Sequence, residues 1–191
     1  VQVTKERGLI GRCAFCREPY PLSNNEYNIR NKKRMDMNDS VAIYQASESY
    51  NAGEDGLPRY PQKALKLCLR AAELGNSGAC GRAAHYYKDG IVVQKNMTKS
   101  REYLQKAIKN GDIKSRHNLG MVELEKGNYH LASRHCLISA AAGLAISLEE
   151  IAKFYKIKLV TKKEYSTALA SYIQVHKDEW SIEREAASAT P

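Results

Sequence analysis

Two cysteines near the start of the chain have the spacing best suited to chemistry. Two residues separate Cys13 from Cys16, and this spacing lets two thiolates bind one tetrahedral zinc ion across a tight turn. A structural zinc site needs four ligands, so the sequence predicts zinc only if further ligands lie before Val1. Two alternatives stay open: a pair without metal, and a redox pair, although the chain lacks the strand–helix–strand pattern of a thioredoxin-like setting.

The remaining reactive residues do not form a catalytic pattern. The sequence contains no glycine-rich phosphate loop, no His-Glu-x-x-His motif and no nucleophile elbow. His130 and His135 are five residues apart and point in different directions on a helix, which argues against a shared metal ion. We therefore expect a protein that is not an enzyme. The other cysteines stand at apolar helical positions and are predicted to be small core residues: Cys68, Cys80 and Cys136.

Composition and charge exclude several classes of protein. Of the 191 residues, 43% are hydrophobic, which is too large a share for a disordered chain. The chain has five cysteines, which are too few for a disulfide scaffold. No apolar run reaches the length of about 18 residues that a membrane span needs. The chain shows no secretory signal, so we expect an intracellular protein, cytoplasmic or inside an organelle, and not a secreted one.

The net charge of +9 favours an acidic partner. Basic residues cluster in 30–34, 95–116 and 153–163. Such clusters bind acidic proteins or nucleic acid, but they are more often the solvated faces of helices. Protein is therefore the favoured partner, and nucleic acid is the less favoured one.

Apolar residues follow helical spacing along most of the chain, and strand-like alternation is almost absent. Predicted helices end at Gly75, Gly111 and Gly143, which are 36 and 32 residues apart. A period of about 35 residues with glycine turns indicates stacked pairs of helices. Small residues that would let paired helices approach closely recur at the same period: Ala64, Ser100, Ala132 and Ala168.

The sequence thus predicts an all-α protein, a right-handed α-solenoid of about four helical hairpin repeats with a short Cys-x-x-Cys segment before it. The predicted repeats occupy 39–178, as 39–75, 76–111, 112–143 and 144–178. Residues 179–191 are predicted to form a capping segment. There Ser181 is the expected N-cap of a short last helix, and Trp180 is expected to pack on the fourth repeat near Tyr172 or Ile173.

The motifs within this period resemble the Sel-one-like repeat, a relative of the tetratricopeptide repeat. The matching segments are HNLG at 117–120, HYYKDG at 85–90 and AAELG at 71–75. Glu123 departs from the pattern, because the equivalent residues of the neighbouring repeats are tyrosines. The resemblance implies a scaffold or adaptor that belongs to a larger assembly.

The segment RCAFCREP at 12–19 resembles the last ligand pair of a RING-type zinc finger. This resemblance implies that residues 1–22 are the incomplete end of such a finger, with Cys13 and Cys16 as zinc ligands and residues 23–38 as a basic linker. Arg17 matches the position from which RING ubiquitin ligases steady ubiquitin. Ala14 replaces the usual proline, which argues against ligase activity. Part of a RING-type ubiquitin ligase is an alternative function, on the condition that the full zinc finger is present before Val1.

A curved stack of hairpins has a concave face lined by the first helix of each pair, and such faces bind protein partners. An RNA-binding helical repeat is the alternative, because the charge supports it. Against RNA, no polar pair recurs at fixed positions to read successive bases. The predicted partner-binding residues on this face are Tyr86, Lys88, Arg116, Asn118 and Lys153.

Overall fold

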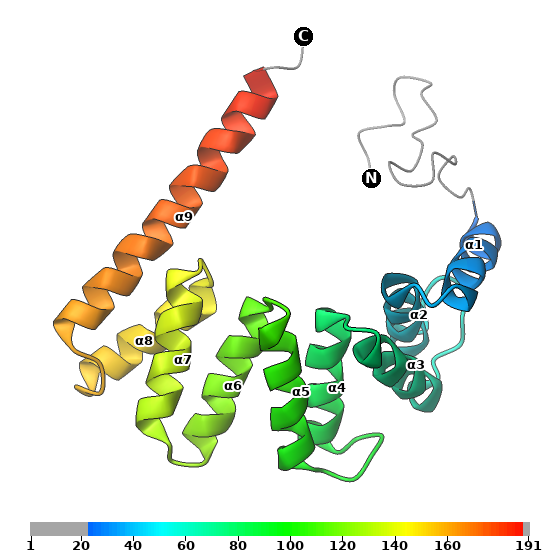
Figure 1. Ribbon diagram of the computed structural model, residues 1–191, viewed down its shortest axis with the longest axis horizontal. Helices are drawn as coiled ribbons and strands as arrows, with labels where there is room; N and C mark the ends of the chain where they lie inside the picture. Colours follow the sequence, from blue (N-terminus) through cyan, green and yellow to red (C-terminus); the bar gives the residue numbers. More distant parts are fainter. Residues whose placement is uncertain (1–22, 189–191) are drawn as a thin grey trace. The chain divides into compact units, whose positions relative to one another are not determined.

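The computed structural model of the chain describes residues 23–188, and within this range it contains helices and no β-strand (Figure 1). The all-α prediction is confirmed. The chain divides into two compact units, one ending at Leu74 and the other beginning at Gly75. The first unit holds α1 (Asn24–Asp36), α2 (Ser40–Ala52) and α3 (Pro61–Glu73). The second holds α4 (Ser77–Asp89), α5 (Met97–Lys109), α6 (Ile113–Glu125), α7 (Tyr129–Ala141), α8 (Ala145–Lys156) and α9 (Lys162–Ser188).

Side-chain caps set where the helices begin. Asn76 Oδ1 accepts a hydrogen bond from the main-chain N–H of Ala79 at 2.9 Å, and Asn96 Oδ1 accepts one from Lys99 at the same distance. Each cap satisfies a donor that the first turn of a helix leaves without a partner. The helices between these caps and the glycines are short, with 13 residues each in α4, α5 and α6. Paired short helices of this kind are the hairpins that the sequence predicts.

The glycines predicted to end helices all have left-handed backbone, with φ of 85° at Gly75, 84° at Gly111 and 94° at Gly143. Their surroundings differ. A Cβ added at Gly143 would lie 2.9 Å from Val175 Cγ1 on α9, whereas a Cβ at Gly111 would meet nothing within 4 Å. Gly143 therefore serves both the turn and the close approach of α9.

We expect Gly143→Ala to destabilise the protein more than Gly111→Ala does. The left-handed backbone alone costs alanine about 1–2 kcal/mol at either site. The contact with Val175 adds about 1–3 kcal/mol at Gly143. Urea unfolding of the two variants measures the difference, and equal losses would mean that α9 shifts freely away from the added methyl group.

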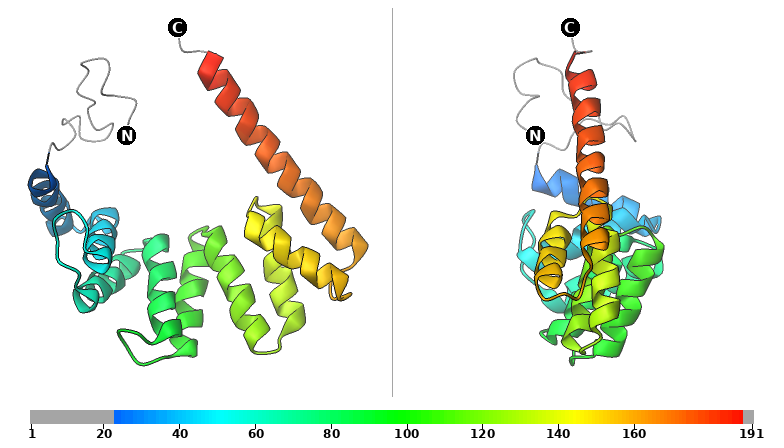
Figure 2. Two further views of the ribbon diagram at one scale, coloured as in Figure 1. Left: turned by 180° about the vertical axis from the view of Figure 1, so that it is seen from behind. Right: turned by 90° about the vertical axis from the view of Figure 1, so that its left-hand side faces the viewer.

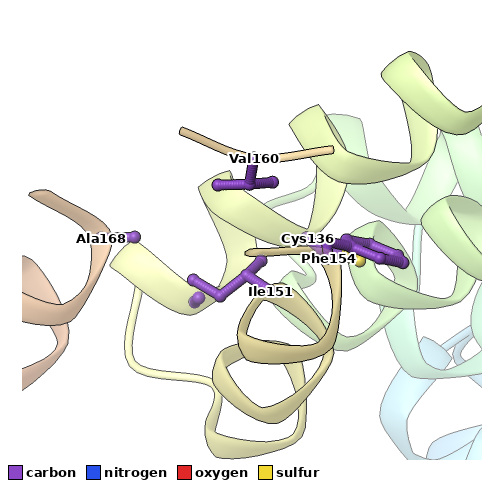
Figure 3. Close-up of a cluster of buried hydrophobic side chains, with 6 residues drawn as sticks. Cys136, Ile151, Phe154, Val160 and Ala168 are labelled. Atoms are coloured by element: carbon purple, nitrogen blue, oxygen red, sulfur yellow. The ribbon is translucent and has the colours of Figure 1, made fainter. Parts of the chain in front are cut away.

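Small residues form most of the core, as the repeat pattern predicts. The four that recur with the repeat are at most 4% exposed: Ala64, Ser100, Ala132 and Ala168. The predicted core cysteines are also buried, and burial raises the pKa of Cys136 to about 12, so this thiol stays protonated. Figure 3 shows one core cluster that joins α7, α8 and the start of α9, made of Cys136, Ala140, Ile151, Phe154, Val160 and Ala168.

The segment predicted to be a basic linker, 23–38, is mostly helix α1. Ser23 Oγ caps the helix by accepting from the Glu26 N–H at 3.2 Å. Asn31 is buried and donates through Nδ2 to the Ala42 carbonyl of α2 at 3.2 Å, which ties the two helices together. The segment resembles a linker in sequence because its helix uses caps and a buried amide in place of an apolar stripe.

The prediction that a last helix begins at Ser181 is wrong. Ser181 lies inside α9, which Figure 2 shows as one unbroken helix extending well past the end of α8. The helix begins with a reciprocal cap, in which Thr161 N donates to Glu164 Oε2 at 2.8 Å and Glu164 N donates to Thr161 Oγ1 at 3.3 Å. The packing predicted for the Trp180 side chain lies outside the residues whose side chains are described.

Candidate functional site

The first helices of the hairpins in the second unit repeat one alternation of buried and outward positions. Tyr86 of α4, Val122 of α6 and Phe154 of α8 are each at most 8% exposed. The preceding residues of α4 and α8, His85 and Lys153, are exposed. The structure therefore places Tyr86 in the core, and we leave it out of the candidate surface.

A small polar cleft lies between α4, α5 and α6, with a volume of about 90 Å³. Two predicted partner-binding residues, Lys88 and Asn118, line it together with His85 and Ser100. Asn118 Nδ2 lies 3.4 Å from His85 Nε2. Ser100 is 1% exposed, and within residues 23–188 its hydroxyl has no hydrogen-bond partner. The cleft can thus accept or donate hydrogen bonds through side chains of three helices.

Charge around this cleft is partly balanced. Lys88 Nζ forms an ion pair with Glu125 of α6 at 2.9 Å, and both side chains keep exposed surface. The protein around the cleft partly excludes water from the His85 ring, and this desolvation lowers the pKa of the ring, although Asp89 opposes the shift. The ring is therefore neutral near pH 7 and offers one donor and one acceptor.

The other two predicted residues do not join the cleft. Arg116 is half-buried on α6 and does not line the cleft. Lys153 of α8 hydrogen-bonds Glu150 at 2.5 Å, and this bond raises the pKa of Lys153. Cys13 and Cys16 lie outside the described residues, so their zinc binding stays a prediction. In the part of the chain that is described, no three His, Cys, Asp or Glu residues gather closely enough to hold a metal ion.

Sequence reasoning missed an ion pair next to this surface, between a buried carboxylate and a partly exposed arginine. Glu123 of α6 is 0% exposed, and its Oε1 lies 3.0 Å from Arg101 Nε of α5. Its Oε2 accepts a hydrogen bond from Asn128 Nδ2 at 2.7 Å. A signal was present in the sequence, because Glu123 stands where neighbouring repeats have tyrosine. The replacement is a polar junction between two hairpins.

A second buried polar chain joins α6, α7 and α8. His117 Nδ1 lies 2.9 Å from Ser147 Oγ, which lies 2.7 Å from Ser139 Oγ, and all three residues are buried. Burial lowers the pKa of His117, and the nearby charge of Glu150 opposes this shift. Because Ser147 is 0% exposed, the arrangement stabilises the stack and is closed to a substrate.

We expect the free energy of unfolding to fall as the pH falls below about 6.5. Burial lowers the pKa values of His85, His117 and His135 in the folded protein. Below about pH 6.5 the unfolded chain therefore binds protons at these histidines that the folded protein does not bind. The loss of stability stops once the pH falls below the folded-state pKa values. Urea unfolding at several pH values measures the slope. His117→Gln should reduce it, with His176→Gln as the exposed control, and a slope unchanged by His117→Gln would contradict the assignment.

Comparison with known proteins agrees with the repeat architecture. Residues 40–76 and 77–112 match the Sel1 repeat family, each one residue later than the predicted 39–75 and 76–111. No curated protein sequence matches the chain. No helix within residues 23–188 combines the length and apolar character needed to cross a membrane. The chain is thus a helical repeat protein with two Sel1-type segments, and the hairpins after residue 112 continue the same layout.

A solved structure of a Sel1 repeat protein shows the same fold. A Sel1 repeat protein from Oxalobacter formigenes matches with a TM-score of 0.68 at 23% identity, over 81% of this chain and 64% of that protein. A protective antigen of uropathogenic Escherichia coli strains, described as displaying an SLR fold, gives a TM-score of 0.42 at 16% identity, over 85% of this chain and 43% of that antigen. The chain therefore spans less than two thirds of either protein.

Proposed function

We propose that this chain is a non-enzymatic scaffold that binds a protein partner through the face formed by α4 and α6. Residues 40–112 match Sel1 repeats, and further helical hairpins follow them. The observation that carries this proposal is the cleft lined by His85, Lys88, Ser100 and Asn118. It offers hydrogen-bonding groups at its wall, among them the ammonium of Lys88, which is paired with Glu125. Stacked hairpins present such groups on neighbouring helices, which suits a peptide segment laid across them.

Crosslinking tests this proposal. A photoreactive amino acid replaces Asn118 in the cleft, and a matched one replaces Gln105, which is exposed on α5 and outside the cleft lining. In extracts of the cells that make the protein, the photoreactive group at position 118 should form a crosslink to a discrete protein. The group at position 105 should not form this crosslink. Equal crosslinking from both positions would contradict the proposed face.

RNA binding is the competing outcome. Nuclease treatment of the crosslinked species separates the two, because an RNA adduct loses its mass and a protein adduct keeps it. Salt adds a second measure. Binding through Z phosphates of single-stranded RNA weakens with a log–log slope of about −0.7Z, whereas a contact made mainly by neutral groups changes far less. A steep slope together with nuclease-sensitive adducts would replace the protein scaffold by an RNA-binding repeat.

A further inference from the structure

Arg116, which lies outside the cleft, belongs to a group of three arginines on consecutive helices of the second unit. This arginine cluster consists of Arg101 on α5, Arg116 on α6 and Arg134 on α7. Arg116 is half-buried, and within residues 23–188 its guanidinium has no hydrogen-bond partner and no carboxylate within ion-pair distance. The carboxylate of Asp112, one turn earlier, instead caps α6 by accepting from main-chain N–H groups of the first turn. Because a partly buried cation without an anion is unfavourable, a negatively charged ligand would stabilise this position.

The packing of α6 on α7 brings Arg116 close to His135. Gly120 follows Arg116 by four residues on the same face of α6, and a Cβ added at Gly120 would lie 3.2 Å from His135 Cβ. Glu123 follows Gly120 by three residues on this face, and its Oε1 lies 3.0 Å from Arg101 Nε. His135 therefore faces the stretch of α6 that separates Arg116 from the ion pair of Arg101 and Glu123.

The surroundings of His135 carry an excess of positive charge. Partial burial lowers the pKa of the His135 ring, the charges of the three arginines lower it further, and Glu123 opposes them. Arg134 is the residue next to His135 on α7, and it is exposed. Among the charged groups that act on this ring, three cations face one carboxylate, which leaves two positive charges without an anion.

The number of these charges and the geometry of arginine favour a phosphomonoester over other anions. A phosphomonoester carries about −1.5 to −2 charge near pH 7 and has three acceptor oxygens. A carboxylate or a phosphodiester carries a single negative charge, so it would balance only half of the excess. Each guanidinium presents its N–H groups as a planar fork that matches two oxygens of a phosphate. A phosphomonoester therefore balances the excess charge and offers an oxygen to each arginine.

We propose that the arginine cluster binds a phosphomonoester group, the dianion that a phosphorylated side chain or a mononucleotide carries. Arg116 and Arg134 donate to its terminal oxygens, and the charge of Arg101, shared with Glu123, adds to the attraction. The arginines come from three consecutive helices, so the stacking of the hairpins builds the site. None of the three lines the cleft between α4 and α6, so the cluster can bind phosphate whether or not the cleft binds a protein.

Fluorescence anisotropy of the full chain measures the selectivity of the cluster. The probe is a labelled glycine–serine peptide with one phosphoserine, compared with the same peptide carrying glutamate or serine at that position. The phosphoserine peptide should bind at least about tenfold more tightly than the glutamate peptide. Unlabelled uridine monophosphate then distinguishes the two sources of the group. Competition supports a site for small phosphorylated molecules, and a lack of competition supports one for phosphorylated side chains.

Substitutions test which cations hold the phosphate. Arg116→Gln and Arg134→Gln should each weaken binding of the phosphoserine peptide about tenfold, because each removes hydrogen bonds between charged groups. Arg116→Lys keeps the charge but loses the planar fork, and it should weaken binding about threefold. The matched controls Lys109→Gln and Lys114→Gln remove one charge from exposed positions of α5 and α6 and should change the Kd less than about twofold. Circular dichroism checks the fold, and the exposed Arg134 decides the matter if the Arg116 variants are unfolded.

A histidine signal shows where the phosphate binds. A dianion beside His135 opposes the charges of the arginines and raises the pKa of the ring. The NMR titration midpoint of His135 should therefore move to higher pH when the phosphoserine peptide is bound. His85 lies on α4 outside the arginine cluster, and its midpoint should stay in place.

Four results would overturn the proposal. The first is equal affinity for the phosphoserine and glutamate peptides. The second is an equal loss of affinity in the arginine variants and the control lysine variants, which would reveal general attraction by a basic protein. The third is an unchanged His135 midpoint with the peptide bound, which would place the phosphate elsewhere. The fourth is tighter, arginine-dependent binding of an oligouridine without terminal phosphates, which would assign the cluster to the phosphodiesters of RNA.

Discussion

Arg101→Met should destabilise the protein by about 3 kcal/mol, because it leaves the carboxylate of Glu123 buried without its cation. Glu123 has no exposed surface, and Arg101 lies 3.0 Å from it. After the substitution, the hydrogen bond from Asn128 at 2.7 Å is the contact that still supports the charge within residues 23–188. Urea unfolding of the variant and the parent measures the loss.

A double-mutant cycle separates the ion pair from simple loss of packing. Glu123→Gln should cost less than Arg101→Met, because Arg101 is 40% exposed and can turn its charge to water. The double variant Arg101→Met/Glu123→Gln should recover much of the loss, since no buried charge remains. Additive losses would show that the two residues act independently and would contradict the proposed junction.

Phe154→Ala should destabilise the protein by about 3–5 kcal/mol, as truncation of a buried aromatic ring usually does. Phe154 is 4% exposed and belongs to the cluster of Figure 3, which also contains Ile151, Val160 and Ala168. Losing the ring leaves a cavity where α7, α8 and the start of α9 meet. Thermal and urea unfolding measure the loss.

The next residue supplies the matched control for this core variant. Tyr155 is 39% exposed and stacks on Tyr165 with the ring centres 5.2 Å apart. Tyr155→Ala should therefore cost only about 1 kcal/mol. If the two variants lost equal stability, the stacked tyrosines and not the buried cluster would hold α9 in place.

Local signals in the sequence were sufficient for the helices and their period. The glycines at 75, 111 and 143 adopt the left-handed backbone expected of them, and the small residues that recur with the repeat are buried. These features depend on neighbours in sequence, so they can be read without knowledge of the fold. Helix α1 escaped notice because the contact of Asn31 with the Ala42 carbonyl is tertiary.

The candidate surface was predictable only in part. Tyr86 and Tyr87 are adjacent, and helical spacing alone did not tell which ring points inward. Alignment of Tyr86 with Val122 and Phe154, both buried, decides the matter once the repeats are superposed. The role of Glu123 could not be read locally, because its cation, Arg101, lies on the previous hairpin.

The small residues of the core have a consequence for the entropy of folding. Alanine loses no rotamer freedom when it is buried, and serine loses little, whereas long side chains lose up to about 2 kcal/mol each. Many fully enclosed positions in this protein are alanine, among them Ala64, Ala79, Ala83, Ala107, Ala132 and Ala140. The repeats therefore gain less free energy from apolar burial than a core of leucines would. They also lose less side-chain conformational entropy when they fold. Close approach of helix backbones, and not bulk, holds the hairpins together.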